Sequence, residues 1–340
     1  MKGSDSRRST NEDLIEAGDL DALTDRIDSL CFDSQWDLLL VLRNGCRAAL
    51  ERGKQLWPAA AYAEYRIALD APGKLAASVI ESPAERFSFG PFAEVMASAH
   101  SFADLCEYLP AGPGRGSVAQ ERVARGEDLR PEVWLRSEDP FGLPLHLLSF
   151  ESAYCCPVYE PSKCVDDAPD LPRFEPASRS TAGDRIPDFV DVIDSLRDLA
   201  TTWSTQSNGR AEAVVVDGGA SQAIAALGCS THRLARISPA EAAAWMAWAA
   251  ASGGAHGRRR GMAAGRHAAL WALLCVAGLA DPEHEIRDHP LDELAEVLDE
   301  LEYVLFDDGS PPSGWNLRLA IADPVDGIAF AVSAADARMN

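Results

Sequence analysis

The stretch "WNLRLAIADPVDGIAFAVSAAD", Trp315 to Asp336, contains two runs rich in apolar residues around an Asp-Pro-Val-Asp-Gly turn. Two such runs joined by a short turn predict an antiparallel β-hairpin. The segments "AEAVVVDGG", residues 211–219, and "HRLARI", residues 232–237, predict two more strands. The C-terminal part of the chain therefore contains a small mixed or antiparallel sheet.

Helices separate and follow these strands. Ser238, Pro239 and Glu241 form a capping signal, with a proline at the first helical position and a carboxylate at the third. Leucines at positions 291, 294, 298 and 301 recur at helical spacing. Since helices outnumber strands, the predicted fold class is α+β and helix-dominated.

The sequence as a whole predicts three consecutive parts. Residues 1–136 contain five or six amphipathic helices joined by Gly/Pro turns, and residues 188–340 form the α+β domain. Between them, residues 137–187 contain eight prolines, which prevent a long helix and predict a strap or linker. At 340 residues the chain is long enough for about two domains.

Composition excludes several classes of partner. The formal net charge is −22 and the pI is about 4.6, which argues against binding to nucleic acid or to an anionic membrane surface. The N-terminus lacks the apolar core of a signal peptide, and no apolar run reaches the ~20 residues of a membrane span. Eight cysteines without a C-x-x-C pair indicate a reducing, cytoplasmic environment. Of these, Cys155, Cys156 and Cys164 fall in a predicted loop and are candidate reactive thiols.

The candidate site lies in "SGGAHGRRRGMAAGRHAALW", Ser252 to Trp271. Ser252, Gly253 and Gly254 predict the end of the preceding helix, and the following residues predict the start of a second one. On that helix Gly257, Gly261 and Gly265 would share one face. Three glycines on one face predict close approach of either the alanine-rich preceding helix or a ligand.

The arginines of this stretch predict an anion. In the first helical turns, Arg258, Arg259 and Arg260 would oppose the helix dipole, so a negative group should compensate them. The chain's own carboxylates are the favoured source, and a phosphate- or carboxylate-bearing ligand is the functional alternative. The candidate ligand-binding residues are Gly254, His256, Arg258, Arg259, Arg260, Arg266 and Arg210, with His267 as a second candidate histidine.

Established motifs are absent. There is no G-x-x-x-x-G-K-[ST] phosphate loop and no G-x-G-x-x-G dinucleotide fingerprint, so no cofactor is expected. His284 and His289 are five residues apart, a spacing that does not share a helix face, so no metal site is expected. The segment "AIAALGCSTHRLARI", residues 223–237, also matches the sequence pattern of a helix-turn-helix motif. The acidic composition of the chain disfavours this DNA-binding alternative.

Three functions remain open. The leading hypothesis is a cytoplasmic binding or regulatory protein whose Gly/Arg helix start accepts an anionic small molecule or an acidic segment of a protein partner. The second is an enzyme that acts on a phosphorylated or carboxylated small molecule, with the arginines as a substrate clamp. The third is an acidic binder that neutralises a basic protein, in which case the arginines are buried and paired within the chain.

Overall fold

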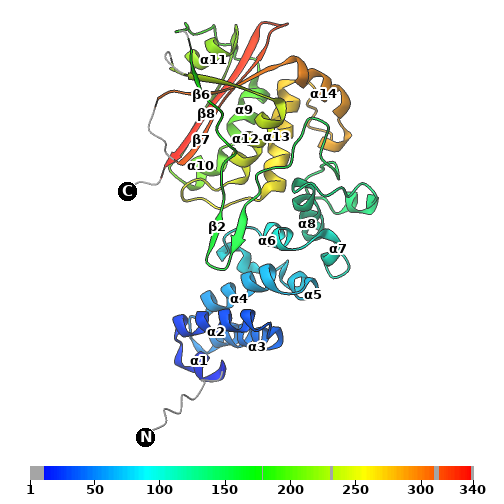
Figure 1. Ribbon diagram of the computed structural model, residues 1–340, viewed down its shortest axis with the longest axis vertical. Helices are drawn as coiled ribbons and strands as arrows, with labels where there is room; N and C mark the ends of the chain where they lie inside the picture. Colours follow the sequence, from blue (N-terminus) through cyan, green and yellow to red (C-terminus); the bar gives the residue numbers. More distant parts are fainter. Residues whose placement is uncertain (1–10, 178, 230–232, 310–313, 338–340) are drawn as a thin grey trace. The chain divides into compact units, whose positions relative to one another are not determined.

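The computed structural model describes residues 11–177, 179–229, 233–309 and 314–337. It is a helix-dominated α+β fold (Figure 1), as the sequence predicts. Contacts within the chain divide it into two compact units: residues 1–118 with 158–165, and residues 119–157 with 166–340. Residues 119–136, expected with the N-terminal helices, thus fall in the second unit, and residues 158–165 of the expected strap fall in the first.

The first unit is built from short helices. Its α-helices are α1 (Asn11–Ala17), α2 (Leu20–Phe32), α3 (Trp36–Ala48), α4 (Trp57–Asp70), α5 (Gly73–Ala76), α6 (Phe92–Ala99), α7 (Phe102–Leu105) and the first part of α8 (Pro113–Ala124). Three 3₁₀ helices join them: η1 (Ala49–Arg52), η2 (Ala77–Val79) and η3 (Pro83–Phe87). Strands β1 (Val158–Glu160) and β2 (Lys163–Val165) pair as an antiparallel hairpin, in which Tyr159 donates a hydrogen bond to Glu94 Oε2 at 2.6 Å.

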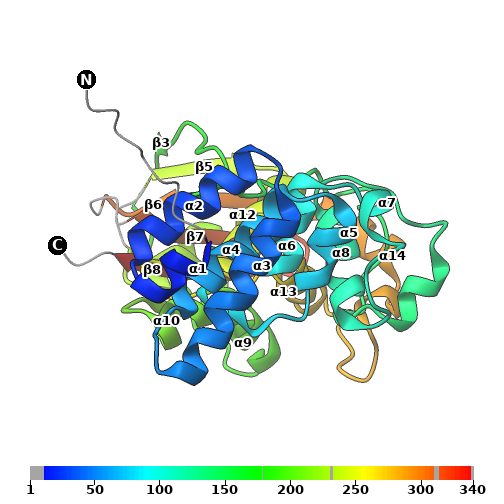
Figure 2. The same cartoon turned by 90° about the horizontal axis from the view of Figure 1, so that it is seen from below.

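The second unit contains a six-stranded antiparallel sheet in the order β3-β5-β6-β7-β8-β4. The strands are β3 (Glu175–Pro176), β4 (Arg210–Asp217), β5 (Arg233–Ile237), β6 (Glu302–Asp307), β7 (Gly314–Asp323) and β8 (Ile328–Ala337). In Figure 2 the labels β3, β5, β6, β7 and β8 follow this order down the view. The predicted C-terminal hairpin is confirmed as β7 and β8, which pair from Asp323↔Ile328 to Gly314↔Ala337.

The helices of the second unit cover both faces of this sheet. They are α9 (Val190–Asp198), α10 (Thr201–Gln206), α11 (Ala220–Ala226), α12 (Pro239–Ala251), α13 (Met262–Val276) and α14 (Leu291–Glu300), with 3₁₀ helices η4 (Val133–Ser137) and η5 (Ile286–Asp288). Figure 1 shows α9, α12 and α13 on one side of β6–β8 and α11 on the other. Two cores follow from the alternation along each strand: Leu317, Leu319 and Ile321 pack toward α12 and α13, whereas Ala320 and Ala322 pack toward α11.

The helix signal at residue 238 is confirmed. The Glu241 N–H donates to Ser238 Oγ at 3.2 Å, and the Ser238 N–H donates to Glu241 Oε2 at 2.7 Å, so both halves of the capping box form. By contrast, the helix-turn-helix alternative is wrong, because Arg233–Ile237 is strand β5 and pairs with β6. Its β-branched end and its cross-strand partners outweigh any helical tendency there.

Candidate functional site

The Gly/Arg stretch is a loop followed by a helix. Helix α12 ends at Ala251, and α13 begins at Met262, with Gly261 before it at φ 95°. Arg258, Arg259 and Arg260 therefore precede α13, and the prediction that they occupy its first turns is wrong. The positive end of the helix dipole disfavours cations there, and Gly261 supplies the left-handed φ that allows the loop to enter the helix.

The predicted glycine face is also wrong in part, because only Gly265 lies within α13. A Cβ at Gly265 would lie 2.2 Å from the Ala247 carbonyl oxygen of α12, so this glycine permits close contact between the two helices. Gly254 has a different role, since it adopts φ 68° in the loop beside Asp336. The close partner of the helical glycine is thus the alanine-rich α12, one of the two partners that the sequence allows.

The predicted ligand-binding residues do not share one partner. The Arg259 guanidinium is 2.6 Å from Asp166 Oδ2, and its side chain is 5% exposed. Arg258 and Arg260 are exposed and form no salt bridge with a carboxylate among the described residues. His256 is exposed in the same loop, and Arg210 is exposed at the start of β4.

Arg266 is the exception, because it is fully buried at 0% exposure. Its Nε and Nη2 donate to the two carboxylate oxygens of Glu151, both at 2.8 Å. Nη1 also donates to the Pro144 carbonyl at 3.0 Å, and Nη2 to the His146 carbonyl at 2.7 Å. Because its charge and its donors are satisfied within the protein, Arg266 is a structural residue that holds residues 144–151.

The start of α13 is also supplied with an anion by the chain itself. The Ala263 N–H donates to Glu121 Oε1 at 2.9 Å, and the other carboxylate oxygen of Glu121 lies 3.0 Å from Arg125 Nη1. A carboxylate at a helix N-terminus satisfies both a free N–H and the helix dipole. The anions that the sequence predicts are therefore carboxylates of the chain itself. Glu121 serves the start of α13, Glu151 serves Arg266 and Asp166 serves Arg259.

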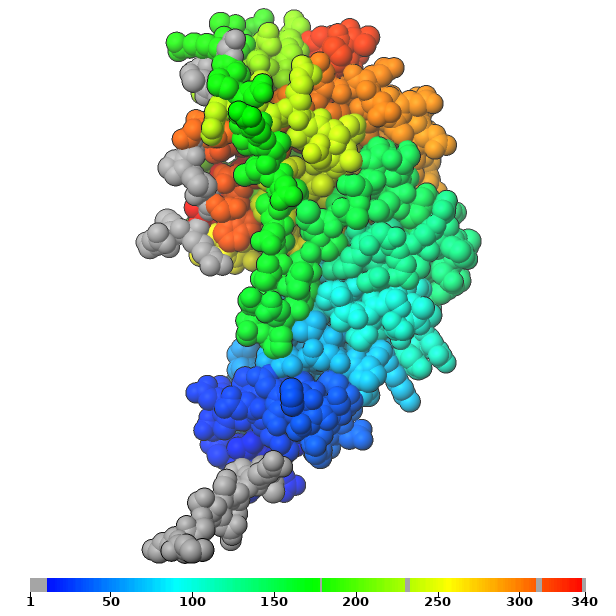
Figure 3. Space-filling view, viewed as in Figure 1, coloured from blue at the N-terminus to red at the C-terminus, as the bar shows by residue number. Residues whose placement is uncertain are grey.

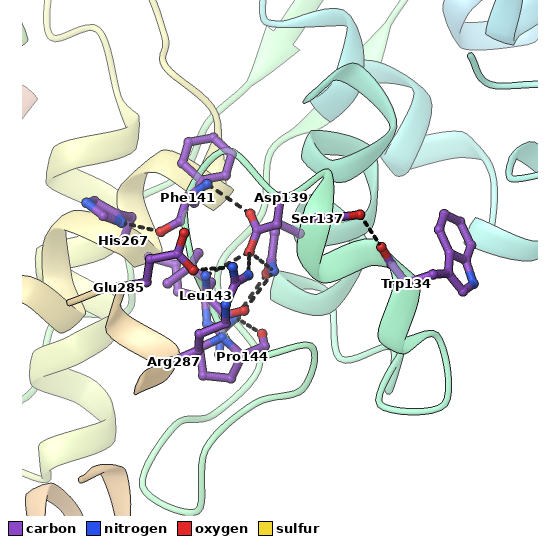
Figure 4. A network of polar contacts seen from close by, with 11 residues as sticks. Trp134, Ser137, Asp139, Phe141, Leu143, Pro144, His267, Glu285 and Arg287 are labelled. Atoms are coloured by element: carbon purple, nitrogen blue, oxygen red, sulfur yellow. Dashed lines mark hydrogen bonds and ion pairs between the residues drawn. The ribbon is translucent and has the colours of Figure 1, made fainter. Parts of the chain in front are cut away.

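The loop held by Arg266 is fixed from a second side by Asp139 (Figure 4). The Asp139 carboxylate accepts hydrogen bonds from the backbone N–H groups of Phe141 at 2.9 Å and Leu143 at 2.8 Å, and from Gln120. The Arg287 N–H donates to the Gly142 carbonyl at 2.9 Å, and His267 Nδ1 lies 2.9 Å from the Phe141 carbonyl. Residues 139–151 are thereby held rigidly against α13 and η5.

This rigid loop forms one wall of a pocket of about 280 Å³, which we call the arginine pocket. It is lined by Arg130, Arg136, Leu143, Pro144, Leu145, His146, Arg287 and Leu291. Three arginines and one histidine thus line it, and none of the described lining residues is an Asp or Glu, although the chain has 53 acidic and 31 basic residues. The Leu129 N–H donates to the Leu145 carbonyl at 2.8 Å, which brings Arg130 next to His146.

Carboxylates behind the pocket orient two of these arginines. Arg130 forms a two-pronged salt bridge with Asp128, and Arg287 contacts both Asp139, at 3.4 Å, and Glu285. Arg136, on η4, is exposed and forms no salt bridge within the described part of the chain. A guanidinium has five N–H donors, so orientation by one carboxylate leaves donors for a ligand.

The pKa of His146 responds both to burial and to the charges around it. Burial lowers the pKa of His146, and the charges of Arg130 and Arg266 lower it further, against the opposing effect of Asp128 and Glu151. Burial is the largest of these effects and is independent of charge, whereas the lowering by Arg130 and Arg266 shows that two cations lie close to the imidazole.

Sequence reasoning did not find this pocket. Arg130, Arg136 and Arg287 are scattered among ordinary surface positions of the sequence, and His146 lies in the proline-rich segment from 137 to 187. One usable signal was present: the segment from 137 to 187 has many turn residues, and loops held by a scaffold are common places for binding residues.

The other candidate chemistries gain no support. Burial raises the pKa of the Cys155 thiol, and Asp170 and Asp167 raise it further, which reduces the reactive thiolate. Among the described residues no group of three His, Cys, Asp or Glu side chains is arranged to hold a metal ion. No helix in the described ranges combines the length and the apolar character needed to cross a bilayer.

Comparison with known proteins adds a family. No curated protein and no solved structure matches the chain. The DUF6183 family, described as a family of unknown function, matches residues 21–332, which include all the residues of the arginine pocket and the whole Gly/Arg stretch. The chain therefore belongs to the DUF6183 family.

Proposed function

We propose that the protein is a binding protein for a small phosphate- or carboxylate-bearing ligand, which it holds in the arginine pocket. The observation that carries this proposal is the gathering of Arg130, Arg136, Arg287 and His146 around one pocket whose described lining includes no carboxylate. Guanidinium groups favour phosphate and carboxylate because their planar N–H pairs match two oxygens of such a group.

The ligand class is the one expected from the sequence, but the residues differ. In the Gly/Arg stretch, Arg266 fixes the carbonyl groups of Pro144 and His146, and His267 contacts that of Phe141. These two residues position the pocket wall and do not themselves line the pocket. A preorganised wall supports binding because less conformational entropy is lost when the ligand enters.

A binding experiment with inorganic sulfate tests the proposal. Sulfate keeps its double charge between pH 5 and 8, so any pH dependence comes from the protein. We expect millimolar or tighter binding by calorimetry, and at least a fivefold rise in Kd for Arg136→Gln, about 1 kcal/mol. Arg136 is exposed and has no carboxylate partner in the described structure, so this variant should fold normally.

The matched control is the double variant Arg258→Gln/Arg260→Gln, which removes two exposed arginines of the Gly/Arg stretch. It should bind sulfate like the unaltered protein. If it loses binding while Arg136→Gln retains it, the anion site is the Gly/Arg loop and the assignment to the arginine pocket is wrong. Equal binding by all three proteins, or none by any, would refute the proposal itself.

The ionisation of His146 gives an independent readout. The pKa of His146 is lowered in the free protein, and a bound dianion should raise it, because the anion stabilises the imidazolium. Because this pKa is lowered from its ordinary value, sulfate should bind more tightly as the pH falls below about 6.5. NMR titration of the His146 ring protons, with and without sulfate, measures this shift, and an unchanged pKa would place the anion elsewhere.

A further inference from the structure

A second pocket lies in the sheet of the second unit, where two neighbouring strands separate. The β6–β7 ladder runs from Glu302↔Ala322 only to Leu305↔Leu319. Beyond that point β6 continues its pairing with β5 to Arg233↔Asp307, and β7 continues its pairing with β8 to Gly314↔Ala337. The two halves of the sheet thus part after Leu305, and the last residues of β6 face no strand on the β7 side within the described residues.

A cavity of about 400 Å³ occupies this gap, and we call it the fork pocket. Trp245 of α12 lines the fork pocket from the face of the sheet that α12 covers. Arg318 of β7 lines it from the opposite face, because residues 318 and 320 alternate to the same side and Ala320 packs toward α11. Phe174, which precedes β3, closes a further side, and in Figure 3 the green segment that carries it lies beside the orange residues of β6 and β7. A volume of this size lies within the range of small-molecule sites.

The walls of the fork pocket are mostly apolar. Trp245, Leu305 and Phe306 are buried, and Phe174 is half-buried. The guanidinium carbon of Arg233 lies 5.9 Å from the centre of the Phe174 ring, and Arg233 is paired with Asp307 across the β5–β6 ladder. These contacts fix Arg233 and Phe174 as parts of the wall and leave an apolar surface for a ligand.

One nitrogen of a charged side chain in the fork pocket has no hydrogen-bond partner in the described part of the chain. The side chain of Arg318 is 15% exposed, and its Nη1 lies 3.0 Å from Asp308 Oδ1. Its Nε is buried and has no hydrogen-bond partner among the described residues. A buried donor on a charged group is costly to leave unpaired, and so its presence beside a cavity points to a ligand oxygen.

The surrounding charges restrict the ligand. Asp307 and Asp308 lie beside the two arginines, so the region is close to neutral before a ligand binds. A phosphate dianion would meet two carboxylates, whereas a single carboxylate would share the Arg318 guanidinium with Asp308. The chemistry therefore favours one negative charge on an otherwise apolar molecule.

We propose that the fork pocket binds an apolar or aromatic monocarboxylate, whose carboxylate accepts a hydrogen bond from Arg318 Nε while its apolar part packs against Trp245 and Phe174. Such a group occurs in free carboxylic acids and at the C-terminus of a peptide that ends in an apolar residue.

Ligand-observed NMR and calorimetry with four probes test this proposal. The probes are 3-phenylpropionate, 3-phenylpropionamide, and a tetrapeptide that ends in phenylalanine with a free or an amidated C-terminus. We expect at least one acid to bind with a Kd below about 5 mM, and its amide to bind at least tenfold more weakly. Tighter binding of the free tetrapeptide than of phenylpropionate would identify a peptide C-terminus as the ligand, and the reverse would identify a free acid.

Three variants make the test specific. Arg318→Lys keeps the charge but removes Nε, and Phe174→Ala removes a half-buried ring; each should weaken binding of the acid at least fivefold. Arg236→Gln is the matched control, because Arg236 is an exposed arginine of β5 that is paired with Glu302 and does not line the fork pocket. It should leave the Kd unchanged.

Three results would overturn the proposal: equal affinity for acid and amide, unchanged binding of the acid by a folded Arg318→Lys variant, or no binding of either acid. Circular dichroism and the melting temperature report whether Arg318→Lys folds. If it does not fold, the acid–amide comparison on the unaltered protein and the Phe174→Ala variant still decide the question. These outcomes are independent of sulfate binding at the arginine pocket.

Discussion

At the scale of single residues, Arg266 explains most about the candidate site. Its guanidinium is buried and contacts Glu151, Gln120 and two backbone carbonyls. Attraction between two buried charges must first offset the cost of removing both from water. The pair is therefore weak as a source of stability, but the loss of one member leaves the other charged and buried.

We predict that Arg266→Leu lowers the free energy of unfolding by about 3–5 kcal/mol, because Glu151 then lacks its counter-charge. The double variant Arg266→Leu/Glu151→Leu should be less destabilised than the single variant, since no buried charge remains. Urea denaturation measures both. A loss below about 1 kcal/mol in the single variant would show that Glu151 is solvated after the change.

The same pair predicts a pH dependence. Burial raises the pKa of Glu151, but the hydrogen bonds and charge of Arg266 and the Leu148 N–H outweigh burial, so the folded-state pKa is lowered. The ionised Glu151 therefore contributes its full stabilisation at pH values above its pKa in the unfolded chain, near 4.5. This contribution is lost as the pH falls from there through the lower pKa of the folded state. The stability difference between the unaltered protein and Glu151→Gln should therefore shrink below about pH 4.5.

At the scale of helices and strands, local signals predicted the structure well where a partner is close in sequence. The Ser238 capping box and the β7–β8 hairpin are both recognisable because each depends on residues within a few positions. The start of α13 could not be placed from such signals. Its first turn is capped by Glu121, which is 142 positions away in sequence, and no local pattern reveals that partner.

The contact between α12 and α13 predicts the effect of filling Gly265. In an isolated helix, alanine stabilises the helix by about 1 kcal/mol relative to glycine. At position 265, however, the alanine Cβ would lie 2.2 Å from the Ala247 carbonyl oxygen. We expect Gly265→Ala to lower the free energy of unfolding by about 1–3 kcal/mol, the typical cost of overpacking. Thermal or urea unfolding measures this change.

Gly45→Ala in α3 provides the comparison for this prediction. The Cβ of an alanine at position 45 would lie 2.5 Å from the terminal carbon of the Ile15 side chain, which can rotate away. The loss of stability should therefore be smaller than for Gly265→Ala. If the two variants were equally stable, close approach of α12 would not be the reason for a glycine at position 265.

At the scale of the whole molecule, the acidic composition gives a testable electrostatic property. The formal charge of −22 creates repulsion within the folded state, and salt screens it. We predict that the melting temperature rises by several degrees between about 10 mM and 300 mM sodium chloride. Scanning calorimetry measures this, and a melting temperature that stays constant or falls would show that ion pairs outweigh the repulsion.

The composition and the periodicity of the chain thus predicted the fold class, but the candidate site was only partly predictable. The need for an anion near the Gly/Arg stretch was recognised from Arg258, Arg259 and Arg260. Whether an acidic side chain of the protein or a ligand supplies it depends on long-range contacts such as Arg259–Asp166. The arginine pocket was hidden for the same reason, because Arg136 and Arg287 come together only in the folded chain.

The burial of Arg266 has a consequence for how the chain matures during synthesis. Glu151 leaves the ribosome 115 residues before the guanidinium that neutralises it, and Gln120 leaves 146 residues before its own contact with Arg266. Until α13 emerges, the segment from Gln120 to Glu151 has no complete set of native contacts, and it stays accessible to chaperones and proteases. Translation that stalls before codon 266 should therefore release fragments that are degraded rapidly, whereas chains that also contain β6, β7 and β8 should survive.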